Sequence, residues 1–373
     1  MRNVFLKGVF AGFQRVLVVA VVCACVSACE QDGPVVQGEG MPLSFVTLSK
    51  NIKSDSRAAY SGVFGTTVYY ANELSEITNQ NKHTKIWADL DNVAVSNHNG
   101  IWTTDQTKYW PSAGGIFVAA YSPYDAGTTG GTTTSSRVQM PYNMNTPYVY
   151  GVTENKQKDL LFADVQWLPV KTSSSSAVPV MFNHALAMVS VNIKLSTQGV
   201  GDDSWKLTLK KVELLNVNKK GSVEIRNNGN NGWSTNNDGA WNVVDGTYET
   251  FVKTVNTQLT SSQTKVFENL IVIPQKLRPS SHAASQTVKI TYDLETTRKY
   301  IDNEGKEQVV VEVKKDMFHA IPLQTKEIAI WKMGQRLTYN ITFNSGAEIE
   351  FEGGANAWED EMTVDKAING RNV

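Results

Sequence analysis

The chain has 373 residues, of which 41% are hydrophobic and 19% are charged, and its formal net charge at pH 7 is -1. A chain of this length can form two domains, each large enough for its own hydrophobic core. The nearly neutral charge provides no basic field of the kind that attracts nucleic acid, so no nucleic-acid partner is expected.

The first residues have the pattern of an export signal. Three basic residues precede a short apolar run at 16–26, which is too short to span a bilayer as a permanent helix. Ser27 and Ala28 are small and stand directly before Cys29. This order resembles the lipobox of bacterial lipoproteins, in which the chain is cut before the cysteine and the thiol is acylated. The alternative is an ordinary signal peptide that is cut after Ala28.

These features predict a signal peptide at 1–28 and a lipid on Cys29. Cys23 and Cys25 would leave with the signal peptide, so the exported protein would hold no disulfide. More than one acyl chain on Cys29 would anchor the protein stably in the membrane. The segment 29–42, with its glycines and Pro34, is expected to be a flexible tether between the membrane and the folded body.

The body of the chain alternates apolar and polar residues with the period of β-strands. The alternation is clear at 189–195, and again at 205–209. Its phase then slips at Lys210 and Lys211, which predicts a β-bulge.

Turn residues separate further alternating segments. A turn at 302–305 is predicted between strands at 288–294 and 309–313. A second turn at 344–346 follows the strongest pattern, at 337–343, and predicts a hairpin. The single candidate for a short helix is 70–77.

These patterns predict an all-β protein. Antiparallel strands that each have one wet face stack as sandwiches. The serine-rich segment 171–176 is the best candidate for a linker. We therefore expect an N-terminal β-sandwich domain at 43–172 and a C-terminal β-sandwich domain at 177–373.

No motif for catalysis, for a cofactor or for a metal stands out. None of the histidines is spaced four residues from another, and the Gly/Thr-rich stretch 127–136 lacks the lysine of a phosphate loop. The Asn/Gly-rich stretch 227–238 offers one carboxylate, whereas calcium prefers several oxygen ligands. We therefore predict no catalytic residue, no cofactor and no metal, and a protein that is not an enzyme.

His184 and two tryptophans need separate interpretations. His184 lies in a strong strand pattern and is expected to be a structural residue at the junction of the two halves. Trp233 and Trp241 lie in or beside the Asn/Gly-rich stretch, where a hydrophobic core explains them least. They are weak candidates for stacking on a sugar.

The segment Phe182-x-His184-x-Leu186, followed by an alternating strand, resembles the start of the second domain in fimbrillin-like proteins. These are surface lipoproteins and pilus subunits of Bacteroidales-type bacteria. Other short segments resemble the family in the same order, at 56–58, 110–111, 117–124, 158–163, 270–275, 331–339 and 358. The chain departs from the family pattern at Ser122 and in its charged tail.

The resemblance implies two tandem transthyretin-like antiparallel β-sandwiches and a mode of assembly. In pilus-forming members, cleavage after an arginine removes the lipid and the first strand, and a strand from another subunit fills the groove. The bond between Arg57 and Ala58 is the candidate cut in this chain. The candidate exchangeable strand carries the apolar residues Leu43, Phe45, Val46 and Leu48. The other interpretation of Arg57 is an ordinary exposed arginine.

The resemblance thus implies a surface-exposed protein of the outer membrane, either anchored there or released into fimbriae. Its role would be structural and adhesive, as a stalk, tip or accessory subunit. The implied partners are other fimbrial subunits by strand addition, the outer membrane through the lipid on Cys29, and a host or bacterial surface glycan or protein. The alternative function is a surface lipoprotein that binds a glycan through Trp233 or Trp241.

Overall fold

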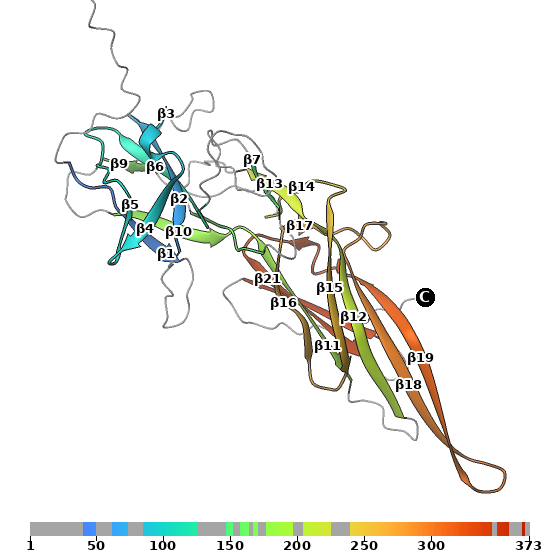
Figure 1. Ribbon diagram of the computed structural model, residues 1–373. Coiled ribbons are helices and arrows are strands. Elements are labelled where there is room, and N and C mark those ends of the chain that lie inside the picture. Colours follow the sequence, from blue (N-terminus) through green and yellow to red (C-terminus); the bar gives the residue numbers. More distant parts are fainter. Residues whose placement is uncertain are drawn as a thin grey trace, which may run out of the picture.

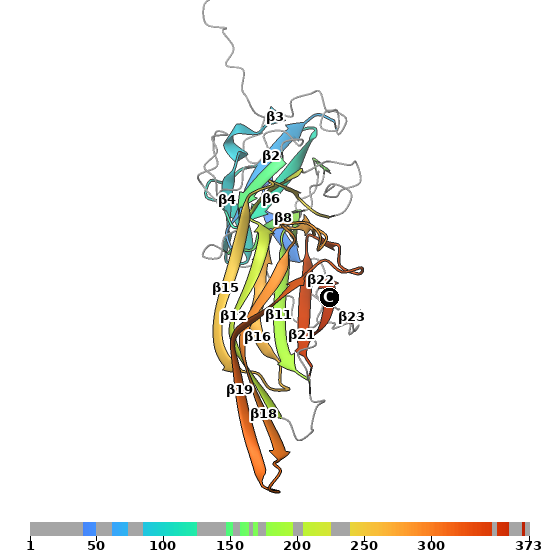
Figure 2. The same ribbon diagram turned by 90° about the vertical axis from the view of Figure 1, so that its right-hand side faces the viewer.

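The computed structural model describes residues 40–49, 62–73, 85–124, 147–151, 157–163, 167–170, 177–196, 204–224, 239–344, 349–357 and 368–369. Within these ranges the regular structure is β, apart from the 3-10 turn η1 (Ala88–Leu90). The all-β prediction is therefore confirmed. Figures 1 and 2 show two β units placed end to end, which we call the N-terminal and C-terminal units. The described part of the chain has no helix with the length and hydrophobicity needed to cross a membrane.

The N-terminal unit is built on one sheet with the strand order β3-β2-β4-β5-β1-β10-β8-β6-β9. Its strands are β1 (Phe45–Ser49), β2 (Phe64–Ala71), β3 (Lys85–Ile86), β4 (Val93–His98), β5 (Ile101–Thr104), β6 (Gly115–Ser122), β8 (Leu161–Ala163), β9 (Trp167–Pro169) and β10 (Val178–His184). Strand β10 follows the expected linker 171–176 in sequence, yet it pairs in this sheet; the linker itself lies outside the described residues.

This sheet closes on itself, which differs from the expected two-layer sandwich. Strand β2 pairs with β4 on one edge and with β6 on the other, and these two strands belong to different arms of the strand order. Gly65 allows the closure, because a Cβ atom there would lie 2.4 Å from Cε1 of Tyr121. The alternating pattern of a strand identifies its buried face, but it does not say whether that face meets a second sheet or the inside of a closed one.

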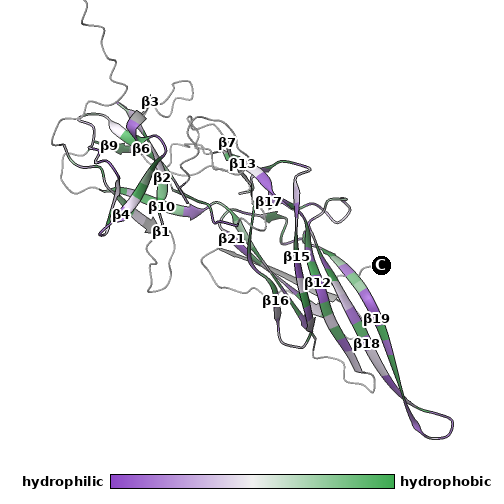
Figure 3. Cartoon of the chain, in the orientation of Figure 1, coloured by the Kyte–Doolittle hydropathy of each residue, from purple (hydrophilic) through white to green (hydrophobic). Residues whose placement is uncertain are grey.

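The C-terminal unit consists of two sheets packed face to face. One has the order β16-β11-β21-β22-β23, and the other has the order β15-β12-β18-β19. Their bounds are β11 (Ala187–Leu195), β12 (Ser204–Asn218), β15 (Tyr248–Gln258), β16 (Thr264–Val272), β18 (Thr287–Ile301), β19 (Glu307–Pro322), β21 (Gln335–Phe343), β22 (Ile349–Ala357) and β23 (Ile368–Asn369). Buried side chains from both sheets, such as Val189, Leu207 and Tyr339, form one core. Figure 3 shows hydrophobic and hydrophilic segments alternating along these strands.

Several local predictions for this unit are confirmed. Strand β12 shifts its register between Leu209 and Lys211 against both of its neighbours, which is the predicted bulge. The turn after β18 is closed by a hydrogen bond from the Asp302 N–H to the Lys306 carbonyl oxygen (3.0 Å). Strands β21 and β22 form the predicted antiparallel pair. The helix expected at 70–77 is wrong at its start, since Tyr70 belongs to β2.

Two strand pairs are parallel, although antiparallel strands were expected throughout. Strand β1 runs parallel to β10 over its five residues, and β11 runs parallel to β21. The partners in each pair are far apart in the sequence. No hairpin turn therefore fixes their direction, and the alternation of side chains is the same for either direction.

The two units meet at a hydrophobic contact that we call the seam. Its N-terminal side includes Tyr69 and Phe117, and its C-terminal side includes Val223, Trp241 and Ile273. Strand β7 (Pro147–Gly151) pairs with β13 (Lys220–Glu224), which in turn pairs with β14 (Asn242–Val243), in a small separate sheet. Buried side chains from both units form the seam.

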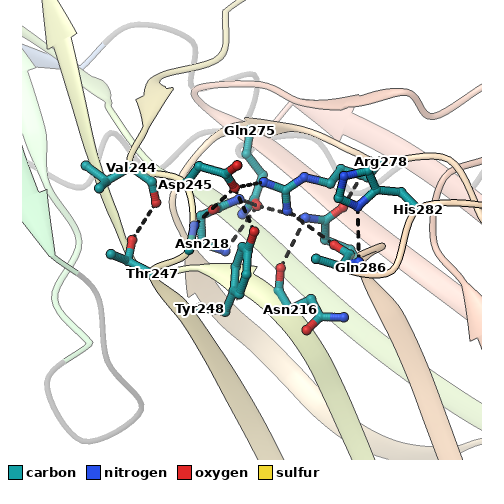
Figure 4. Close-up of polar contacts among 12 residues, drawn as sticks. Asn216, Asn218, Val244, Asp245, Thr247, Tyr248, Gln275, Arg278, His282 and Gln286 are labelled. Atoms are coloured by element: carbon teal, nitrogen blue, oxygen red, sulfur yellow. Dashed lines mark hydrogen bonds and ion pairs between the residues drawn. The ribbon is translucent and has the colours of Figure 1, made fainter.

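A buried polar cluster lies near the seam end of the C-terminal unit, beside the short strand pair β17 (Gln275–Lys276) and β20 (Ile330–Trp331). Asn218 donates from its main-chain N (3.2 Å) and from Nδ2 (2.6 Å) to Oε1 of Gln275. Gln286 donates from Nε2 to the carbonyl oxygen of Asn216 (3.1 Å) (Figure 4). The side chains of Asn218, Gln275 and Gln286 are buried, so these bonds replace water for groups that solvent cannot reach.

The rim of the same cluster is charged and exposed. Asp245 accepts a hydrogen bond from the Tyr248 hydroxyl (2.6 Å) and pairs with Arg278. The Tyr248 bond is the largest cause that lowers the pKa of Asp245, and the Gly246 N–H and the Arg278 charge add to it. Figure 4 shows this rim beside the buried amides.

We expect Gln275→Leu to lower the free energy of unfolding by about 1–3 kcal/mol, because it leaves the two Asn218 donors buried without their acceptor. Urea-induced unfolding measures the change. The double variant with Asn218→Leu is the control, and its loss should be smaller than the sum of the two single losses. Additive losses would show that the two amides do not act as a pair.

Candidate functional site

The candidate site is the place of β1 in the closed sheet of the N-terminal unit. Strand β1 lies between β10, with which it pairs along its whole length, and β5, which it meets through Phe45 and Trp102. The residues just before β1 extend the pairing: the Leu43 N–H donates to the carbonyl oxygen of Lys108 (2.6 Å). The carbonyl oxygen of Ser44 accepts a hydrogen bond from the Val178 N–H (2.7 Å). The segment is thus hydrogen-bonded on both of its edges.

The predicted apolar side chains of this strand divide between its two faces. Leu43 is 3% exposed and Phe45 is 2% exposed, and both join the core inside the closed sheet. Val46 is 40% exposed and faces outward. Leu48 lies in β1, but its side chain is outside the part that the structure describes. Leu43 and Phe45 therefore supply the buried contact of the strand, and Val46 does not.

An aromatic cluster receives Phe45 inside the sheet. The ring of Phe64 lies edge-on to Phe45, with 5.9 Å between centroids. Phe64 also contacts Trp102 (5.5 Å) and Phe182 (5.4 Å). Trp102 and Phe182 belong to β5 and β10, the two neighbours of β1. The sequence analysis did not assign Trp102 or Phe64 to this site, because neither lies near β1 in the chain.

Loss of β1 would leave a slot of defined chemistry. The facing edges of β5 and β10 would have unpaired main-chain groups, and the floor of the slot would be the ring of Phe64 with its aromatic neighbours. Unpaired strand edges over an apolar floor are what β-augmentation requires. Such a slot would suit an extended peptide with an apolar residue at every second position.

Three of the other predicted sites lie outside the described residues. These are Cys29, the bond between Arg57 and Ala58, and Trp233. In sequence, Arg57 lies between β1 and β2. Cleavage at this position would therefore separate β1 from the rest of the closed sheet.

Trp241 is described, and its position argues against an exposed sugar platform. Its side chain is 4% exposed and packs in the seam with Val223 and Ile273. Stacking on a glycan needs an accessible ring face. The candidate role of Trp241 in glycan binding is therefore corrected to a structural role between the units, which explains a tryptophan beside an Asn/Gly-rich stretch.

His184 lies at the junction of the two units, as the sequence predicted. Its Nδ1 atom is 2.7 Å from Oδ2 of Asp159. The chain continues from His184 into Ala185 and Leu186, which are buried in the seam. Within the described ranges, no group of three or more His, Cys, Asp or Glu side chains is arranged to hold a metal ion.

Comparison with known proteins finds a similarity to fimbrial and cell adhesion proteins of Bacteroides species. A family model described as fimbrillin-like matches residues 61–358. A fimbrial protein from Bacteroides vulgatus has a similar fold, with a TM-score of 0.59 and 15% identity over 86% of this chain and 100% of that one. A candidate cell adhesion protein from Bacteroides uniformis has a TM-score of 0.44 and 16% identity over 85% and 99% of the two chains. No curated protein matches the sequence.

We expect Phe45→Ala to lower the free energy of unfolding of the N-terminal unit by about 3–5 kcal/mol, because it leaves a cavity against Phe64. Val46→Ala, one residue along on the exposed face, is the matched control and should change it by less than about 0.5 kcal/mol. Denaturant titration of both variants makes the comparison. Equal losses of unfolding free energy in the two variants would contradict the assignment of Phe45 to the buried face and Val46 to the exposed face.

Proposed function

The chain belongs to the fimbrillin-like family, and on that premise we propose that it is a structural and adhesive subunit of a cell-surface fimbrium that assembles by strand exchange. The observation that carries the proposal is the position of β1. This strand fills a slot between β5 and β10, and it comes directly before the segment that contains Arg57.

Cleavage between Arg57 and Ala58 would turn β1 from a part of the chain into a bound peptide. Burial of Leu43 and Phe45 would then hold it with roughly 1.5–3 kcal/mol for each side chain. Each ladder hydrogen bond would add about 1 kcal/mol. A peptide that is held only by these interactions can dissociate and leave the slot. A strand that is still covalently connected to the chain returns to the same slot.

The empty slot would accept a strand from another subunit. That strand would need main-chain groups to pair with β5 and β10, and apolar side chains at every second residue to replace Leu43 and Phe45. The joint would be non-covalent. Its lifetime would depend on how many apolar side chains the incoming strand places over Phe64.

Anchoring and release fit the same order of events. Lipid on Cys29 would hold the newly exported protein at the outer membrane, and the same cut that frees β1 would separate the body from the lipid. The protein would then be exposed at the cell surface, first anchored and later within a fimbrium, and its partners would be other fimbrial subunits. We include in the proposal that both units are variants of the tandem transthyretin-like sandwich, with closure of the sheet as the departure in the N-terminal unit.

We expect Arg57→Ala to leave the mature N-terminus at Cys29 and to abolish the high-molecular-weight ladder that surface material forms on mild SDS gels. Wild-type surface material should instead begin at Ala58. Lys53→Ala, in the same segment, is the matched control and should behave as the wild type. N-terminal sequencing of protein from intact cells, together with the gels, makes the test.

Two results would contradict the proposal. The first is a wild-type protein that always begins at an acylated Cys29, which would leave an anchored accessory role. The second is an unchanged ladder for Arg57→Ala, which would show that assembly does not depend on release of β1.

A further inference from the structure

The hairpin of β18 and β19 extends beyond the other strands of the C-terminal unit. Figures 1 and 2 show its tip at the end of the molecule that is farthest from the N-terminal unit. The first residue of β12, Ser204, lies opposite Thr297, and among the described strands the rest of β18 toward the tip pairs with β19 alone. Strand β19 is the outer strand of its sheet, and within the described ranges its second edge has no pairing partner.

The exposed part of β19 is apolar to a degree that is unusual for an edge strand. Val309, Val310, Val311 and Val313 are 54%, 47%, 55% and 50% exposed. The run from Glu307 to Lys314 contains no proline and pairs with β18 without a register shift. Proteins usually protect a free edge with charged side chains, a proline, a bulge or a cover, because it is a template for another strand, and here Glu312 and Lys314 are the charged residues among the valines.

The turn at the tip determines which residues of β19 have main-chain groups that point away from β18. The Asp302 N–H donates to the Lys306 carbonyl oxygen, which makes these two residues a hydrogen-bonded pair. Hydrogen-bonded and non-hydrogen-bonded pairs alternate along an antiparallel ladder. The main-chain groups of Glu307, Val309, Val311 and Val313 are therefore directed outward.

The sequence of these outward residues can pair with a copy of itself that runs in the opposite direction. In order they are Glu307, Val309, Val311 and Val313, and Lys315 follows on the same side. In an antiparallel pair of two such strands centred on Val311, Glu307 lies opposite Lys315, Val309 lies opposite Val313, and Val311 lies opposite its own copy. On this face both ends of the pair have opposite charges and the middle residues are all valine, while on the other face Val310 lies opposite Glu312.

We propose that β19 is an interaction surface for a second copy of this chain, which pairs with it edge to edge about a two-fold axis at Val311. The result is one sheet that continues through both hairpins. This contact is separate from the strand exchange proposed at β1, and it would join subunits side by side. The charges favour a second copy as the partner: Glu307 pairs with Lys299 of its own hairpin (3.1 Å), and the facing Lys315 of the second copy adds a further opposite charge.

Two features limit the contact to the outer half of β19. The pairing of β18 with β19 shifts between Tyr292 and Leu294, where the Asp316 N–H donates to Oδ1 of Asp293 (2.9 Å). Asp316 has a φ of 53°, so the strand leaves its regular course there. This bulge ends the straight edge just after Lys315. A short edge buries little area, so a weak contact is expected, favoured by the high local concentration at a cell surface.

The test is disulfide trapping of Val311→Cys on intact cells with a membrane-impermeant oxidant. Hydrogen-bonded pairs in an antiparallel ladder have Cα atoms about 5.5 Å apart, within the range of a disulfide. We expect a dimer on non-reducing gels that a reducing agent converts to monomer. The wild-type chain is the control for any disulfide that Cys29 forms.

Val313→Cys is the matched control, since Val313 is 50% exposed and Val311 is 55% exposed. In the proposed pairing, the two copies of residue 313 are about 13 Å apart along the strands, which is too far for a disulfide. Trapping of Val313→Cys as efficiently as Val311→Cys would overturn the register. Absence of the Val311→Cys dimer would overturn the contact.

A second experiment tests whether charge selects the partner. In the Val311→Cys background, Glu307→Lys alone or Lys315→Glu alone should reduce the trapped dimer by roughly tenfold, because like charges then face each other. Co-expression of these two chains with different tags should restore a mixed dimer, since each charge again meets its opposite. Failure of the mixed pair to form would overturn the assignment of a second copy. Ladders on mild SDS gels should be unchanged throughout, which separates this contact from strand exchange at β1.

Discussion

Closure of the N-terminal sheet depends on β1, because this strand connects β5 to β10. The remaining strands of the ring, from β5 through β4, β2, β6 and β8 to β10, pair with one another without β1. Phe45 covers Phe64 from its place in β1 and completes the aromatic cluster. Because β1 is the first strand of the described residues, its removal would leave one slot and would not cut the chain between the other strands. Its place before Arg57 makes β1 suited to exchange, whereas β2 pairs with β6 over seven residues, also pairs with β3 and β4, and is buried on both faces.

The sequence predicted the local features of this fold and missed its long-range ones. The bulge after Leu209 and the turn at Asp302 were predicted correctly, because each is determined by residues next to each other in the chain. The parallel direction of β1 and β10 was not predicted, since no turn joins them. Trp241 was misassigned for a related reason: its burial depends on the contact between the two units, which leaves no periodic pattern in the sequence.

The same division between predictable local features and unpredicted long-range contacts holds at the candidate site. The resemblance to the fimbrillin-like family indicated Leu43, Phe45, Val46 and Leu48, and of the described side chains among them Leu43, just before β1, and Phe45, in β1, are buried. Val46 follows Phe45 directly, so the period of two places it on the opposite face. The aromatic floor could not be predicted, because Phe64, Trp102 and Phe182 come from three separate strands. A pattern within one strand shows which side chains are buried, but only the pairing of strands shows what they are buried against.

The seam bears on how such a subunit could carry force. A pull on the slot of β1 acts on β10, and β10 leads directly into Ala185 and Leu186 of the seam. Strand β11 follows at once and runs parallel to β21 at the centre of its sheet. The strand that would hold a neighbouring subunit is therefore continuous with the core of the C-terminal unit. Gln157, just before β8, exchanges hydrogen bonds with the main chain of Ile271 in β16 (3.0 and 3.2 Å), so separation of the units must break polar contacts as well as the hydrophobic seam.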